Sequence, residues 1–68
     1  MRVAKIMEIT SESNISFEDA TRAGIARAAK TVDLIQGAWI KEQKVIVTGG
    51  TVTGYRVDLK VTFLLKED

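Results

Sequence analysis

Cysteine, histidine and proline are all absent from this 68-residue chain. Without cysteine and histidine, the chain has no disulfide, no thiolate or imidazole metal site, and no catalytic arrangement that depends on either side chain. A chain of this length is one domain (residues 1–68) near the lower size limit for folding by burial alone. Because small domains usually rely on disulfides, a structural metal or self-association, we predict that this chain assembles with copies of itself. Its Ser and Thr residues have no histidine to activate them, so we predict a non-enzymatic protein.

An excess of charge and a long apolar run are also missing. Ten basic and nine acidic residues give a net charge of +1. This charge is too small to indicate binding to nucleic acid or to an anionic membrane. No apolar stretch approaches the ~20 residues of a membrane span, and the start MRVAKIMEIT lacks the layout of a signal peptide. We therefore expect a soluble, cytoplasmic protein with neither a nucleic acid nor a membrane as partner.

The first half of the chain reads as a strand followed by a helix. Residues 2–9 are rich in Val, Ile and Met and precede the turn-forming sequence SESN, so they predict a strand. Ser16, with Asp19 three residues later, predicts a helix that runs to about Val32. Small residues dominate one face of this helix, namely Ala20, Gly24, Ala28 and Ala29 beside Phe17, Ile25 and Val32. The helix should therefore lie close against a sheet.

The second half of the chain predicts two strands, at about residues 38–47 and at residues 55–65. The segment TGGTVTG joins them, and its glycines can supply the positive φ angles of a hairpin. They do not form a phosphate loop, because they join two strands instead of opening a helix. The last strand alternates between an apolar face and a mainly polar one, with Tyr55, Val57, Leu59, Val61, Phe63 and Leu65 on the apolar face. The predicted fold is α+β, a three-stranded antiparallel sheet with one helix on one face.

Trp39, the only tryptophan, raises the question of which face it occupies. If Ala38 and Ile40 pack under the helix, the opposite face holds Gly37, Trp39, Lys41 and Gln43. An inward Trp39 is the alternative, but it would carry Lys41 and Gln43 under the helix, which is costly.

Val45 and Val47 share the alternation of Trp39 but are apolar. A bulge in this strand could therefore exchange the two faces for the residues beyond Gln43. We predict that Trp39 lies on the uncovered face, near Arg56 and Lys60, and that another subunit or a ligand between subunits covers it.

The segments VAKIMEIT, TSESNISFEDATRAGIARAAKTV, AWIKEQKV and YRVDLKVTFLL, taken in order, resemble the dodecin family. The resemblance covers nearly the whole chain and implies a hollow homo-dodecamer that binds or stores a flavin between subunits. In typical members, a tryptophan early in the second strand stacks on the flavin ring and a glutamine on the third strand binds the ring's polar edge.

Aligned without gaps, the stacking position falls on Gly37 and the glutamine position on Arg56, so both differ from the family pattern. Trp39 lies on the same face about 7 Å further along, and a shift of two residues in the loops would restore it to the stacking site. The resemblance implies a ligand site at Trp39, Arg56, Gly37 and Gln43 for FMN, FAD or riboflavin, with Arg56 favouring an anionic ligand.

The departures at Gly37 and Arg56 leave other interpretations open. This sequence is similar to the branch of the family that lacks the flavin-stacking tryptophan, and the alternative is a structural shell that holds ions such as calcium. The candidate oxygen ligands are Glu8, Glu42, Asp58 and Glu67, which lack the spacing of a known calcium loop, so no specific metal site is predicted. Arg56 could equally be an intersubunit ion-pair partner of a residue such as Glu42 or Asp58.

Overall fold

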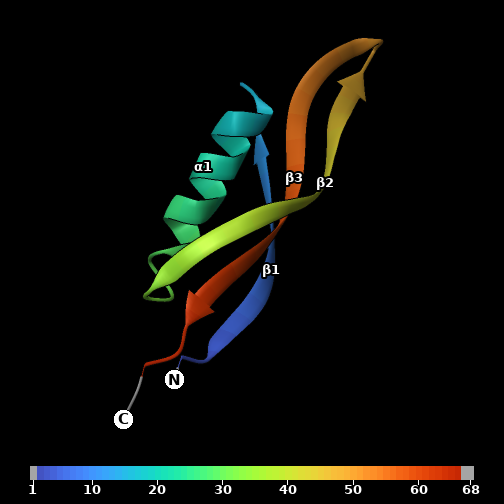
Figure 1. Cartoon of the computed structure of the whole chain (residues 1–68). Helices are drawn as coiled ribbons and strands as arrows, with labels where there is room; N and C mark the ends of the chain where they lie inside the picture. The colour runs from blue at the N-terminus through green and yellow to red at the C-terminus, as the bar shows by residue number, and fades with distance from the viewer. Residues whose placement is uncertain (1, 67–68) are drawn as a thin grey trace.

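The computed structural model describes residues 2–66 and contains one helix and three strands (Figure 1). In chain order they are β1 (Ala4–Ser13), α1 (Phe17–Ala28), β2 (Ile35–Thr48) and β3 (Thr51–Leu64). All pairings are antiparallel and the sheet order is β1-β3-β2, so the last strand lies in the centre. The predicted α+β class and element order are confirmed. Glu67 and Asp68 lie outside the described residues.

The core is built on the central strand. Val57, Leu59 and Val61 of β3 are buried, and Ala20 of α1 packs on them. Tyr55 and Phe63, further along the same face, are half-buried. The predicted alternation therefore holds through the middle of β3, whereas Leu65 lies beyond the end of the strand and is exposed.

Helix α1 begins and packs as its sequence predicts. The Ser16 hydroxyl accepts a hydrogen bond from the Asp19 backbone N–H at 2.9 Å, which caps the first turn. Gly24 is buried against the sheet, where a Cβ atom would lie 3.0 Å from the Cβ of Ser11. The glycine thus permits the close approach of helix and sheet that the small residues predicted.

The helix is shorter than predicted and ends at Ala28 instead of Val32. After this residue, Lys30 and Thr31 donate to carbonyls only three residues back, which tightens the last turn. Leu34 then adopts a positive φ of 61° where the chain turns into β2.

The strands are longer than predicted. β1 continues to Ser13, since Thr10 bonds Asp58 and Glu12 pairs with Arg56 across the sheet, and these contacts override the turn preference of SESN. The hairpin between β2 and β3 is connected by only two residues. These residues, Gly49 and Gly50, have φ angles of 58° and 77°. Two positive φ angles are typical of a type I′ turn.

The expectation that Ala38 and Ile40 pack under the helix is wrong. Both lie on the helix side of the sheet, opposite Val61 and Leu59, but α1 packs mainly on β1 and β3. Ile40 is 47% exposed. A helix about 10 Å wide covers roughly two strands that are about 4.8 Å apart, so the third strand is left bare.

A bulge at Lys41 also corrects the predicted position of Gln43. Ile40 pairs with Leu59 but Glu42 pairs with Asp58, so Lys41 is an extra residue in β2. Gln43 consequently lies opposite Val57, on the helix side, instead of beside Trp39. Trp39 itself, before the bulge, lies on the predicted face.

Candidate ligand site on the open sheet face

The sheet face that points away from α1 is called here the open face. Its middle is a row across the three strands, formed by Glu8 of β1, Lys60 of β3 and Trp39 of β2. The register places Ile6, Thr62 and Gly37 in the row toward the end of β3. In the other direction follow the row of Thr10, Asp58 and Glu42 and then the row of Glu12, Arg56 and Lys44.

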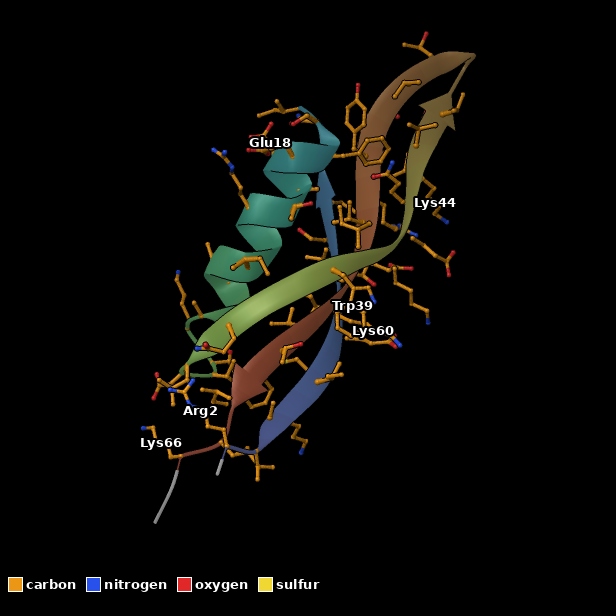
Figure 2. The ribbon with its side chains drawn as sticks, viewed as in Figure 1. Arg2, Glu18, Trp39, Lys44, Lys60 and Lys66 are labelled. Carbon is orange, nitrogen blue, oxygen red and sulfur yellow. The ribbon has the colours of Figure 1, made fainter. Side chains whose placement is uncertain are left out.

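Trp39 is 48% exposed on this face. The ammonium nitrogen of Lys60 lies over the indole, 5.7 Å from the ring centroid, which is cation–π distance (Figure 2). Gly37, two residues earlier on the same face, has no atom within 4 Å of the position that a Cβ would take. The indole therefore adjoins open space on the Gly37 side.

Two lysines share one carboxylate beside Trp39. The Nζ atoms of Lys41 and Lys60 lie 3.6 and 3.8 Å from the same Oε1 atom of Glu8. Lys60 extends from the central strand, while Lys41 extends from the bulge. The three side chains together carry a net charge of +1.

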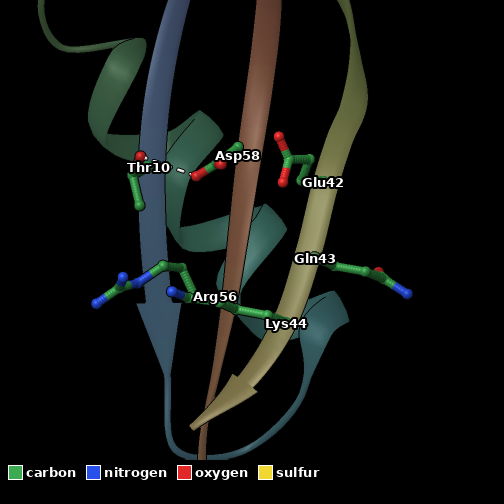
Figure 3. A pocket seen from close by; sticks show the side chains of 6 residues that line it. All are labelled: Thr10, Glu42, Gln43, Lys44, Arg56 and Asp58. Atoms are coloured by element: carbon green, nitrogen blue, oxygen red, sulfur yellow. Dashed lines mark hydrogen bonds between the residues drawn. The ribbon is translucent and has the colours of Figure 1, made fainter.

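A separate cavity of about 320 Å³ lies further along the open face (Figure 3). Its lining comprises Thr10, Glu42, Gln43, Lys44, Arg56 and Asp58. The Thr10 hydroxyl donates to the Asp58 carboxylate at 3.0 Å, and the Glu42 side chain points toward Asp58 from the neighbouring strand. Within residues 2–66, neither Glu42 nor Asp58 has a cationic side chain within salt-bridge distance. Two carboxylates that face each other across a strand pair repel.

The four residues proposed from the sequence fall in two places. Gly37 and Trp39 lie together, whereas Arg56 is four residues from Lys60 along β3, about 13 Å away. Arg56 forms an ion pair with Glu12 of the same chain, not with Glu42 or Asp58. Gln43 lines the same cavity as Arg56 but comes from the other side of β2.

Sequence reasoning missed the link between Glu8, Lys41 and Lys60. No local signal could have found it, because it depends on the register between β1 and β3, which are far apart in the chain.

A metal centre is not assembled by the described part of one chain. Residues 2–66 contain no group of three or more acidic side chains arranged to hold an ion, and Glu67 lies outside the described residues.

Over the same residues, no helix has the length and apolar character to cross a membrane. The cytoplasmic location stays a prediction.

The fold and this face define a small α+β protein of β-α-β-β order with one bare sheet face. The family model described as Dodecin matches residues 3–66. The chain belongs to the dodecin family, which confirms the resemblance.

Known relatives agree in sequence and in structure. The calcium dodecin of Mycobacterium tuberculosis is 33% identical over 66 residues, which cover 97% of this chain and 93% of the relative. A variant of Thermus thermophilus dodecin has a TM-score of 0.92 at 33% identity, covering 98% of this chain and 100% of that one. The dodecin of Streptomyces davaonensis has a TM-score of 0.92 at 26% identity, with 97% of both chains covered.

Proposed function

We propose that this chain is a non-enzymatic dodecin-type protein that assembles into a homo-dodecamer and binds a flat aromatic ligand of the flavin type between its subunits. The observation that carries the proposal is Trp39, a half-exposed indole on a sheet face that no element of the described chain covers. Exposed aromatic side chains on a bare surface are typical of stacking sites and interfaces. Stacking on an indole contributes about 1–3 kcal/mol per ring, by analogy with nucleic-acid bases.

The shape of the single chain supports the self-assembly. The Cα radius of gyration is 14.1 Å, whereas a compact domain of 68 residues is expected near 11 Å. The accessible surface is 4994 Å², compared with about 4,250 Å² for a compact monomer of 7.5 kDa. The surplus of roughly 750 Å² is close to the ~800 Å² that each partner buries in a standard interface.

Apolar side chains supply part of this surplus. Large hydrophobic residues are exposed along the β2–β3 hairpin, namely Trp39, Ile40, Val45, Val47 and Val52. The far end of the hairpin extends beyond α1 (Figure 1), so within residues 2–66 the helix does not shield it there. In the proposed assembly, other copies of the chain cover this surface.

Ligand binding is tested by titrating the purified protein with riboflavin and FMN and following the emission of Trp39 and of the flavin. Since Trp39 is the only tryptophan, its quenching reports on a single site. Trp39→Ala should abolish the quenching of flavin emission, whereas the control Ile40→Ala, which alters the neighbouring residue on the other face, should retain it. Unquenched flavin in the presence of the unaltered protein would overturn ligand binding.

Assembly is tested separately by native mass spectrometry and light scattering. Twelve copies of the 7.5 kDa chain give a particle of about 90 kDa. A folded monomer at micromolar concentration would refute the assembly.

A calcium-binding shell is the second candidate. It is favoured by the facing carboxylates of Glu42 and Asp58, which share a cavity with the Thr10 hydroxyl, and by the relative named calcium dodecin. Calcium takes six to eight oxygen ligands, so further ligands would have to come from water, backbone or other subunits.

Titration calorimetry with calcium chloride tests this candidate. Asp58→Asn and Glu42→Gln should each weaken binding, while Glu18→Gln, which alters an exposed glutamate on α1, should not. The candidate fails if the heat of calcium addition is that of dilution.

A further inference from the structure

We infer that the ligand at Trp39 carries a negative charge beside its aromatic ring and that Lys60 is the residue that selects for this charge. The inference rests on the proposed function, because it specifies the ligand class of the same site. Lys60 takes the place of Arg56, which the sequence suggested as the residue that favours an anionic ligand. Arg56 is neutralised by Glu12 and lies about 13 Å from Lys60 along the sheet.

The charge beside the indole is positive. Lys41 and Lys60 both lie within 4 Å of one carboxylate, that of Glu8, so the pair of ammonium groups is only half neutralised. Lys60 also lies over the indole of Trp39. A ring stacked on that side of the indole would displace this ammonium group from the face of the indole toward the ligand's edge, where it can meet a negative group.

The neighbouring rows determine where such a ligand can lie. On one side, Asp58 and Glu42 present two carboxylates, which repel an anion. On the other side, the row of Ile6, Thr62 and Gly37 carries no charge and has open space above the glycine. The aromatic body fits over this uncharged row, and its anionic group fits toward Lys60, away from the two carboxylates.

Lys60 is better placed than Lys41 to fix the geometry. It extends from the central strand, which is hydrogen-bonded on both sides, and its side chain is 32% exposed. Lys41 is the extra residue of a bulge in an edge strand, and its side chain is 45% exposed. An ammonium group held on a rigid, less hydrated position discriminates better between ligands of different charge.

The test compares three flat probes of similar size in the unaltered full chain, with quenching of Trp39 emission as the readout. They are anthraquinone-2-sulfonate, the uncharged anthraquinone-2-sulfonamide and the cationic proflavine. We expect the sulfonate to bind about fivefold more tightly than the sulfonamide, the factor that corresponds to ~1 kcal/mol for two unit charges 4 Å apart in water. Raising the salt concentration should reduce this advantage and leave sulfonamide binding unchanged.

Three variants identify the residue responsible. Lys60→Gln should remove the preference for the sulfonate and leave the affinity for the sulfonamide within about twofold. Glu8→Gln removes the neutralising carboxylate and should increase the preference, an opposite effect that general damage to the fold cannot imitate. Lys44→Gln, a lysine on the same face in the row of Arg56, is the matched control and should leave the preference unchanged.

The outcomes separate the two proposals. If no probe of any charge quenches Trp39, the proposed ligand site itself fails. If the sulfonate and the sulfonamide bind equally well, or if Lys60→Gln and Lys44→Gln reduce the preference to the same extent, the site stands and the role of Lys60 is refuted.

Discussion

Gly24 offers the sharpest test of how the helix shields the sheet. Its alanine variant has two opposing effects on stability. Alanine is favoured over glycine in a helix interior by about 1 kcal/mol. The added methyl group, however, would lie 3.0 Å from the Cβ of Ser11 and 3.3 Å from the Cδ1 of Leu59.

The steric effect should prevail. Leu59 can adjust its side-chain end, but the Cβ of Ser11 is bonded directly to the backbone of β1 and cannot rotate away. The helix must therefore move off the sheet, and overpacking of this kind costs about 1–3 kcal/mol. We expect Gly24→Ala to lower the free energy of unfolding by about 1 kcal/mol after the gain in helix propensity.

The assay is urea unfolding followed by far-UV circular dichroism at one fixed subunit concentration, because assembly makes stability depend on concentration. A second substitution at Ser11 gives the control. Ser11→Gly removes the Cβ that clashes and should recover part of the loss caused by Gly24→Ala, whereas Ser11→Ala keeps that Cβ and should not. A Gly24→Ala protein as stable as the unaltered chain would show that α1 is not seated against β1 as described.

Three further changes test the core, the turn and the open face. Leu59→Ala removes a buried side chain of the central strand and should cost about 2–5 kcal/mol in urea unfolding; a loss well below 1 kcal/mol would contradict its central place in the core. Gly50→Ala places a side chain at a φ of 77° and should cost about 1 kcal/mol, while Thr51→Ala beside it, with ordinary strand geometry, should cost less. Gly37→Trp introduces an indole where a Cβ meets no atom within 4 Å, so the variant should fold and quench flavin emission more strongly than the unaltered protein. Equal quenching by the two proteins would argue against Gly37 as the stacking position.

Local patterns in the sequence were sufficient for the elements of the fold. The alternation around Val57, Leu59 and Val61 predicted a half-buried strand, and Ser16 with Asp19 predicted the start of the helix. Gly24 and the alanines around it predicted close packing on a sheet. These features depend on residues a few positions apart, whose relation is set by the periods of helix and strand.

The candidate site was only partly predictable. The face of Trp39 followed from strand alternation up to Ile40, but the bulge at Lys41 shifted the parity and moved Gln43 to the other side. The apolar Val45 and Val47 indicated a bulge in this strand, but its position at Lys41 is a choice of pairing between two strands, which the sequence of one strand does not specify. The length of β1 beyond Ile9 was likewise decided by its cross-strand partners on β3.

The sequence determined the chemistry of this protein, since it contains one indole, balanced charges and none of the side chains for disulfides or imidazole catalysis. The tertiary structure decided which charges meet. Pairing of β1 with β3 brought Glu8 between Lys41 and Lys60 and joined Arg56 to Glu12. The width of the helix left part of β2 bare even on the face that α1 packs against. These outcomes depend on register and on the width of one helix against three strands, which are properties of the assembled sheet and not of any local stretch of chain.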